Sequence, residues 1–264
     1  MIFAEEYIPK QVKDCSIIDS RKKFKNKKNK NVILLLEKRF FWMKSFLKNK
    51  KIIIELGSGN GASKEILKNK KIMLTDIQKY SWIDKKVDMT KLNLGRKYKG
   101  KVDVFIINHS LHHCSNPSKL LKKMSIYLKK NGLILINDPE ISFFFKFFLY
   151  ILKHEGWSFK INIFNLKKNI FKSTNPWSAN NAVAYLLFKD EDKFNSYFPE
   201  YEIIKNDLSE FLVFINSGGV VNNTFHIPVN KLAFNFLRLV DKVLIKVMPK
   251  IFALNRSVIL KKIN

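Results

Sequence analysis

The chain has 264 residues, of which 46% are hydrophobic and only nine are glycine and seven proline, so it can bury a sizeable core and is neither largely disordered nor collagen-like. Its net charge of +27 comes almost entirely from lysine, and because readers of nucleic acid rely on arginine for bidentate contacts, this composition argues against a nucleic-acid partner. Two cysteines are too few for a disulfide framework, and no uncharged apolar run reaches the roughly 18 residues that span a bilayer.

Residues 1–50 are expected to form an N-terminal basic segment and a helix, ahead of a main domain over residues 51–264. Residues 20–31 are basic and of low complexity, so we expect a flexible loop that is solvated or contacts phosphates or anionic lipid. The apolar spacing over residues 32–47 then predicts a helix. The chain starts with two glutamates where an export signal has basic residues. We therefore expect the protein in the cytoplasm, with peripheral binding to the inner face of the membrane as the alternative.

From residue 51 onward, apolar runs of strand length alternate with segments of helical spacing. The four clearest runs are IIIEL at 52–56, KIMLTD at 71–76, VDVFIIN at 102–108 and GLILIND at 132–138. Such runs, separated by helices, are typical of buried parallel strands in an α/β sheet. Right-handed crossovers bring the carboxyl ends of these strands to one edge, where we expect a ligand to bind.

The chain after residue 140 is less regular. A helix is expected over the aromatic run 143–152 and a strand and a helix within 183–198, and strands are predicted at 202–205, 211–215 and 257–262. A long helix is predicted at 231–248, where Pro249 ends it. Its cationic residues recur every three or four positions beside a wide apolar face, which fits either core packing or an anionic membrane surface.

The strongest local signal is the segment GSGNGA at 57–62, directly after an apolar strand. Glycines there allow a tight turn and a close approach of backbone to a ligand, and the helix that follows offers free N–H groups. Gly57, Gly59 and Ala62 also fit the dinucleotide fingerprint G-x-G-x-x-G/A, with Asp76 at the distance of a ribose-binding acid. A nicotinamide-dependent oxidoreductase is therefore an alternative.

Glu55 before the turn and the third glycine, Gly61, favour a second interpretation of this segment over the dinucleotide fingerprint. The segment 55–61 resembles the E/D-x-G-x-G-x-G motif of class I S-adenosylmethionine-dependent methyltransferases. This resemblance implies an α/β, Rossmann-like fold with a mostly parallel seven-stranded sheet, helices on both faces and a final antiparallel hairpin. It also implies S-adenosyl-L-methionine as cofactor, with a cofactor-binding half over 51–140 and acceptor-side and C-terminal elements over 141–264.

The resemblance also implies which residues bind the cofactor. Asp76 would accept hydrogen bonds from the ribose hydroxyls, and Asp88 with Met89 would hold the adenine. Asn108 would lie under the methionyl end. An acid that ends a strand is otherwise more often a cap or turn residue. The full implied set is Glu55, Gly57, Ser58, Gly59, Gly61, Asp76, Ile77, Asp88, Met89, Asn108 and His109.

The segment Asn108-His109-Ser110-Leu111-His112-His113 resembles the segment D/N-x-L-H-H of small-molecule methyltransferases of the type 11 group. Later segments, among them KHEGW and NSGGV, resemble an uncharacterised bacterial subgroup of that type, although Gly156 stands where the subgroup has proline. We expect no metal, because the adjacent His112 and His113 should not share a face of one element and no carboxylate lies at ligand spacing.

Methyl transfer to a hydroxyl needs a base that removes the proton. We expect this base to be His154, with a structural role beside Glu155 as the alternative. His113 is a second candidate that either lines the pocket or caps the next helix. The chain lacks Asn-Pro-Pro-Tyr, with which many N-methyltransferases grip a planar acceptor. This favours a hydroxyl of a small molecule, a saccharide or a lipid-linked compound, while a non-catalytic cofactor-binding module is a further alternative.

Overall fold

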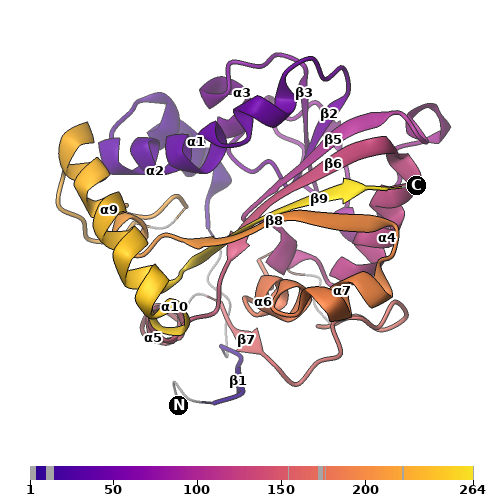
Figure 1. Cartoon of the computed structure of the whole chain (residues 1–264). Coiled ribbons are helices and arrows are strands. Elements are labelled where there is room, and N and C mark those ends of the chain that lie inside the picture. Colours follow the sequence, from indigo (N-terminus) through magenta and orange to yellow (C-terminus); the bar gives the residue numbers. More distant parts are fainter. Residues whose placement is uncertain are drawn as a thin grey trace.

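A computed structural model describes residues 4–9, 15–153, 155–171, 175, 177–221 and 223–263. Its centre is a seven-stranded sheet in the order β4-β3-β2-β5-β6-β9-β8 (Figure 1). The strands in that order are β4 Lys85–Lys86, β3 Ile72–Asp76, β2 Ile53–Leu56, β5 Val102–Asn108, β6 Leu128–Pro139, β9 Asn255–Lys262 and β8 Tyr201–Ser209. β4, β3, β2, β5 and β6 run parallel, whereas β9 is antiparallel to both of its neighbours. The expected fold, including the antiparallel hairpin, is confirmed.

Helices cover both faces of this sheet (Figure 1). One face carries α1 Ile17–Lys25, α2 Lys30–Phe41 and α3 Ala62–Ile66, and the other carries α4 Pro117–Tyr127, α6 Val183–Phe188 and α7 Glu191–Tyr197. Successive strand residues point to opposite faces. Ile53 therefore packs in the core under α2, and Ile54 packs in the core under α4. Both faces of the central strands are buried, which explains their continuous apolar runs.

A third apolar cluster lies at the end of the sheet, where the parallel strands stop. It is formed by α5 Phe143–Leu152, α8 Leu212–Ile215, α9 Lys231–Val247 and α10 Pro249–Phe252, with a small antiparallel pair of β1 Glu6–Tyr7 and β7 Trp157–Ser158. Four single turns complete the described elements: η1 Lys44–Leu47, η2 Met89–Lys91, η3 Arg96–Tyr98 and η4 Leu111–His113. The expected helices at 143–152 and 231–248 are present, and Pro249 opens α10.

The flexible loop expected over residues 20–31 is wrong, because most of it is helical. Ser16 caps α1 by accepting from the Asp19 N–H, which satisfies a backbone donor that the helix leaves open. Ser20 and Phe24 are buried under the lysines that dominate the sequence. Asn29 caps α2 in the same way. The apolar anchors are too few to give a visible periodicity.

Two further expectations are corrected. Residues 183–198 form two helices and no strand, with Asp190 capping α7 through the Lys193 N–H. Residues 211–215, expected as a strand, hold the short helix α8. The carboxylate of Asp241 in α9 accepts from the backbone N–H groups of residues 211 to 213. This distant side chain satisfies the start of the helix, so local spacing could not reveal it.

A buried ion pair joins the N-terminal helices to the sheet. The guanidinium of Arg39 in α2 donates through Nε and Nη2 to the carboxylate of Glu210, which follows β8. Burial opposes the charge on Glu210, but Arg39 and Lys38 hold its pKa at about 2. The pair fixes α2 over the end of the sheet.

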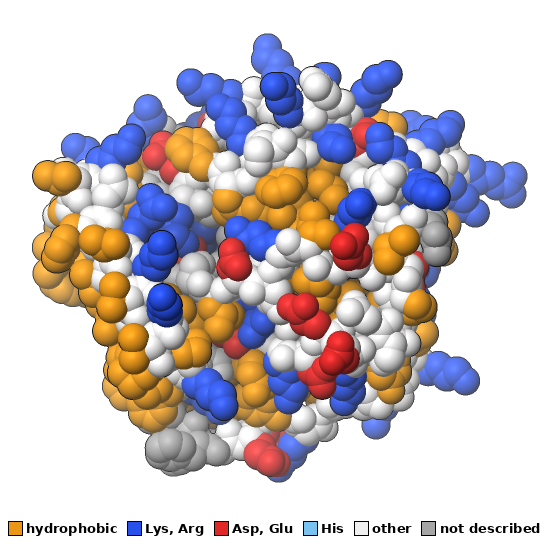
Figure 2. All heavy atoms as spheres, in the orientation of Figure 1, with side chains coloured by type: hydrophobic (Ala, Val, Ile, Leu, Met, Phe, Trp, Pro, Cys, Tyr) orange, Lys and Arg blue, Asp and Glu red, His pale blue; other side chains and the backbone are white. Residues whose placement is uncertain are grey.

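Basic side chains are spread widely over the surface (Figure 2). This spread agrees with a charge that comes from lysines scattered through the sequence. Among the described residues, no helix is long and apolar enough to cross a membrane.

Candidate active site

The glycine-rich turn lies between β2 and α3, at the carboxyl edge of the sheet. Gly57 has a φ of +67°, and a Cβ at this position would lie 2.6 Å from the Cβ of Ser110. Gly59, in contrast, would meet only Ile17 at 3.8 Å. The turn is therefore tightly packed at Gly57, whereas Gly59 has space at its Cβ position while its N–H donates to Asp76 and its carbonyl accepts from Trp82.

Glu55 supports the turn from inside the protein. Its side chain is buried and accepts a hydrogen bond from the hydroxyl of Ser63, while its carbonyl accepts from the hydroxyls of Ser58 and Thr75. Burial raises the pKa of Glu55 to about 7, against the hydrogen bond from Ser63. The structure thus places Glu55 and Ser58 in the support of the turn.

Asp76 ends β3 beside the same turn. Its Oδ2 accepts from the Gly59 N–H at 2.9 Å, and its Oδ1 accepts from the Gln78 N–H at 3.1 Å. Burial raises the pKa of Asp76, although these hydrogen bonds oppose the shift. A carboxylate has about four acceptor positions, so each oxygen keeps acceptor capacity. Ile77 follows as an exposed apolar side chain.

Asp88 and Met89 lie near the turn but differ in what they offer. The Oδ1 of Asp88 accepts from the N–H and the hydroxyl of Thr90, so this carboxylate caps η2. The Cε of Met89 would lie 3.0 Å from a Cβ at Gly57. The structure therefore brings Met89 directly against the glycine turn.

Asn108 ends β5, His109 follows it, and both side chains are tied to the neighbouring strands. The amide of Asn137 in β6 donates to Asn108 at 3.2 Å, and His109 Nε2 lies 3.1 Å from Oδ1 of Asn255 in β9. Burial and the charge of Arg39 lower the pKa of His109 well below its usual value. His109 is therefore neutral and anchors the strand end.

Helix α1 covers the turn, which the sequence did not indicate. Arg21 Nη1 donates to the carbonyl of Asn60, and the amide of Asn60 donates to the Ser20 hydroxyl. The indole of Trp82 donates to the carbonyl of Gly59 at 2.8 Å. The signal for α1 was weak, and no motif marks Trp82.

A cavity of ≈ 320 Å³ lies beside this cover, between α1, α2 and the segment that precedes α9. Its lining includes Ser20, Phe24, Asn29, Asn60, Gly218 and His226. It touches the turn only through Asn60, and neither Asp76 nor Met89 lines it. The cavity is thus a neighbour of the turn and is separate from the strand ends.

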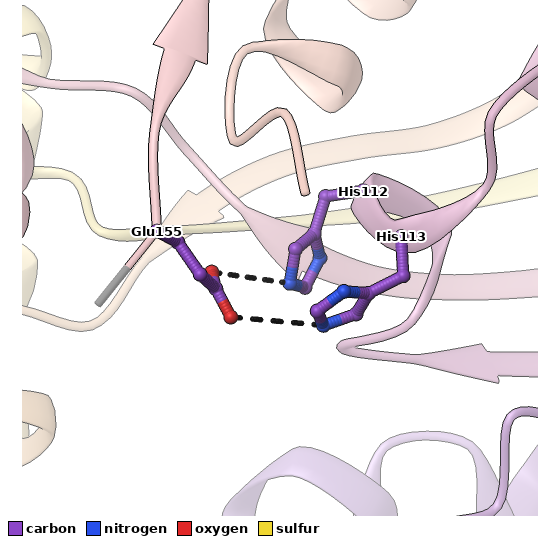
Figure 3. A group of neighbouring side chains, drawn as sticks. All are labelled: His112, His113 and Glu155. Carbon is purple, nitrogen blue, oxygen red and sulfur yellow. Dashed lines mark ion pairs between the residues drawn. The ribbon is translucent and has the colours of Figure 1, made fainter. Parts of the chain in front are cut away.

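Three further side chains converge beyond the end of β5 (Figure 3). His112 and His113 belong to η4, and Glu155 follows α5. His112 Nε2 lies 3.6 Å from Glu155 Oε2, and His113 Nε2 lies 3.7 Å from Oε1. The two imidazole rings have centroids 4.2 Å apart. We call these three residues the histidine cluster.

Each imidazole of the histidine cluster is oriented through its Nδ1 atom. His112 Nδ1 lies 2.9 Å from Oδ1 of the buried Asp138, and His113 Nδ1 lies 3.1 Å from the carbonyl of Ser178. Because both partners are acceptors, we assign the proton to Nδ1 in each ring, which directs Nε2 toward Glu155. Burial opposes a charge on His112, but Asp138 and Glu155 raise its pKa.

The histidine cluster could also hold a cation. One ligand atom from each residue lies within 4.8 Å of the others, and two imidazoles with a carboxylate suit a transition metal. The premise that adjacent histidines face apart is wrong, because η4 is a tight turn and the carboxylate arrives from residue 155. The expectation that no metal binds stays a prediction.

His154 lies outside the described residues, so its predicted role stays a prediction. The stripe on α5 that leads to it is described. Lys146 lies 4.7 Å from the ring centroid of Phe159, and the ring of Tyr150 lies 5.4 Å from that of Tyr7. Lys146 and Tyr150 therefore face the segment around β1 and β7. This segment is far from the glycine turn in the sequence.

Gly156, where proline was expected from the resemblance, has a clear structural reason. A Cβ at this position would collide with the carbonyl of Tyr7. The N-terminal segment therefore crosses directly over Gly156, and only glycine leaves room for it. This crossing lies next to Glu155 and helps to position the histidine cluster.

Comparisons with known proteins agree with this architecture. Residues 25–198 match a family model described as a methyltransferase domain. A solved structure of a SAM-dependent methyltransferase from Archaeoglobus fulgidus has a TM-score of 0.50 and 16% identity, covering 86% of this chain and 93% of that one. A putative S-adenosylmethionine-dependent methyltransferase from Listeria monocytogenes has a TM-score of 0.44 and 10% identity, covering 86% and 98%. No curated protein matches the sequence.

Proposed function

The chain belongs to the methyltransferase domain family and is an S-adenosylmethionine-dependent methyltransferase, and from this premise we propose that it is of the class I, type 11-like group and methylates a hydroxyl group. The observation that carries the proposal is the histidine cluster. It places the Nε2 atom of His113 beyond the end of β5, next to a carboxylate and oriented through Nδ1. We assign His113 as the general base.

The residues around the glycine turn fit the cofactor. Gly59 has space at its Cβ position, Asp76 keeps acceptor capacity for a ribose hydroxyl, and Ile77 and Met89 offer apolar surface beside it. When bound, S-adenosylmethionine supplies a methyl group on a positively charged sulfur. Asn108 and His109 would lie toward this end, since they lie at the end of the strand next to β2.

His113 suits the removal of a proton better than His112 does. The carboxylates of Asp138 and Glu155 raise the pKa of His112 against the effect of burial, which makes this imidazole less suited to release its proton again after each turnover. His113 has a neutral carbonyl behind its Nδ1. After its Nε2 accepts a proton, the carboxylate of Glu155 stabilises the imidazolium. His154, the neighbour of Glu155 in the chain, is the second candidate for the base.

The Asn-Pro pair nearest to the end of β5, Asn116-Pro117, is where an Asn-Pro grip on a nitrogen acceptor would be sought. The amide group of Asn116 donates to the carbonyls of Asn165, Leu166 and Lys168, and its Oδ1 accepts from the Lys119 N–H. Asn116 is therefore committed to the start of α4 and does not grip a planar nitrogen acceptor. The acceptor classes that we propose are a small molecule, a saccharide and a lipid-linked hydroxyl compound.

The test is methyl transfer from labelled S-adenosylmethionine to a panel of hydroxyl compounds from these classes, with the matching amines alongside. The expected result is a methyl ether. His113→Ala should bind the cofactor normally and lose at least about a hundredfold in turnover, because positioned proton removal is worth roughly 10² to 10⁴ in rate. Asp76→Ala is the matched control, since it should weaken cofactor binding instead. Methylation of amines alone, or full activity of His113→Ala, would refute the proposal.

A further inference from the structure

Helix α9 presents a continuous apolar stripe to the outside of the molecule. Five side chains at helical spacing are each exposed to 57–80%: Leu232, Phe236, Leu239, Val243 and Val247. The opposite side of the same helix packs inward through Phe234 and Ile245. The core-packing explanation of this helix therefore covers only one of its two apolar faces. The outer face lies uncovered in the described structure.

A cationic stripe runs beside the apolar one, shifted by one position along the helix. It consists of Lys231, Arg238, Lys242 and Lys246, all of them exposed. The helix holds a single acid, Asp241, which is buried and accepts from backbone N–H groups. The outer face of α9 therefore carries positive charge without a compensating carboxylate of its own helix.

The apolar surface continues beyond α9. Helix α10 packs against both α9 and α5, and Met248, Ile151 and Leu152 are exposed there. Before α9, Phe225 is exposed to 88%. Hydrophobic side chains gather along the edge of the molecule where α9 and α10 lie, with basic side chains beside them (Figure 2). We call this surface the α9 face.

We propose that the α9 face binds the surface of an anionic membrane, with α9 lying parallel to it. Long lysine side chains can reach the lipid phosphates while the leucine, valine and phenylalanine side chains enter the boundary of the acyl chains. Helix α9 has 17 residues, so it spans about 25 Å and offers its stripe along this whole length. The described helices do not cross a membrane, so the binding is peripheral.

Charge decides between lipid and a second copy of the chain. Each copy carries a net charge of +27, and pairing two α9 faces would bring their cationic stripes together. Anionic lipid instead neutralises the stripe, and each Lys or Arg near such a surface contributes roughly fivefold in affinity. This inference is independent of the proposed reaction, because it concerns a surface away from the histidine cluster.

The experiment is flotation of the purified full chain with vesicles of phosphatidylcholine alone and of phosphatidylcholine mixed with phosphatidylglycerol. The chain should float with the anionic vesicles at low salt and be released at high salt. Phe236→Asp should weaken this binding at least about tenfold, since it removes an exposed aromatic side chain that would enter the lipid and adds a repelled charge. Lys242→Glu should weaken it by a similar factor, while Lys242→Arg should retain it.

Two matched controls lie on other surfaces. Ile126→Asp exchanges an exposed apolar residue at the end of α4, and Lys101→Glu reverses an exposed charge before β5. Both variants should bind as the natural chain does. The proposal is overturned if the natural chain stays unbound to anionic vesicles, or if the control variants lose as much binding as Phe236→Asp. It is also overturned if Phe236→Asp merely abolishes a dimer in solution and leaves vesicle binding unchanged.

Discussion

The glycine turn and the histidine cluster lie at the same edge of the sheet but are assembled in different ways. The turn is built mainly from one stretch, residues 55 to 63, in which Glu55 and Ser63 contact each other. The histidine cluster joins η4 to Glu155, and its supports come from Asp138 and Ser178. The first is a local structure, whereas the second exists only after the chain has folded.

A sequence motif can therefore mark the glycine turn, whereas the histidine cluster forms only when distant segments meet in the folded chain. A turn whose φ angles are set within a few residues leaves a fixed spacing of letters in the sequence, even where distant side chains pack against it. The histidine cluster leaves none, because the distance from His113 to Glu155 along the chain depends on the length of β6 and α5. The following predictions test how far each site depends on its own segment.

The largest effect is expected at Gly57. Gly57→Ala should lower the free energy of unfolding by about 3 kcal/mol, since a left-handed φ costs an L-residue about 1–2 kcal/mol and the collision with Ser110 adds overpacking. Gly100→Ala is the matched control, because Gly100 has a φ of +63° with nothing within 4 Å of its Cβ position. It should lose only about 1 kcal/mol. Denaturant unfolding measures both.

The double variant Gly57→Ala/Ser110→Gly sharpens this prediction. It removes the Ser110 Cβ and Oγ atoms that the new Cβ would meet and leaves Met89 Cε, the end of a flexible side chain, at 3.0 Å. It should therefore recover most of the loss that exceeds the Gly100→Ala value, apart from the hydrogen bond of the Ser110 hydroxyl to the Leu56 carbonyl. Equal losses for Gly57→Ala and Gly100→Ala would mean that the turn does not depend on β5. The conformation of the turn would then depend less on Ser110 than the contacts indicate.

The sequence predicted the central sheet because its strands have buried faces on both sides and therefore form apolar runs. The same logic found the turn and Asp76, whose geometry is fixed within β2, β3 and their connections. It missed α1, whose buried residues Ser20 and Phe24 are hidden among lysines and include a single apolar anchor, Phe24. It also missed α8, whose start depends on the carboxylate of Asp241 in another helix.

The residues of the candidate site differ in the same way, because some could be predicted from the local sequence and others depend on contacts across the fold. Met89 and the glycines were predicted and lie together. The sequence did not predict the contact of His112 with Asp138, which depends on the pairing of β5 with β6. The carboxylate of Glu155 reaches His112 from the segment after α5. Such contacts across the fold carry no signal in a single sequence.

An effect of intermediate size is expected from Glu55, because its ionisation makes the free energy of unfolding depend on pH. Its pKa is about 7 in the folded chain against an ordinary value of 4.5, so between these values the folded state binds one proton more than the unfolded state. The stabilisation is complete below pH 4.5 and is lost as the pH rises through 7. The free energy of unfolding should fall by about 2 kcal/mol between pH 5 and pH 7 through this group.

Glu55→Gln removes the titrating group and keeps an acceptor for the Ser63 hydroxyl. The variant should therefore lose this part of the slope and become more stable than the natural chain at alkaline pH. Denaturant unfolding at several pH values gives the comparison. Glu210 does not interfere, because its lowered pKa places its own loss of stability at acid pH, below the ordinary glutamate value. Parallel pH curves for the two proteins would show that Glu55 is ionised in the folded turn.

The smallest effect is expected at Glu155, which in the proposed reaction acts through His113 as a positioning residue. Glu155→Gln keeps the shape and the contact with Asn181 but removes the negative charge beside His113 Nε2. Turnover should fall about tenfold, because the imidazolium loses a stabilising partner, and the acidic limb of the kcat/KM profile should move to lower pH. A purely structural role would lower the activity without moving that limb. Glu202→Gln, at an exposed carboxylate on β8, is the matched control and should leave both quantities unchanged. Because the contact spans two segments that meet only in the folded chain, the pH shift would show directly that the assembled cluster, and not η4 alone, sets the basicity of the site.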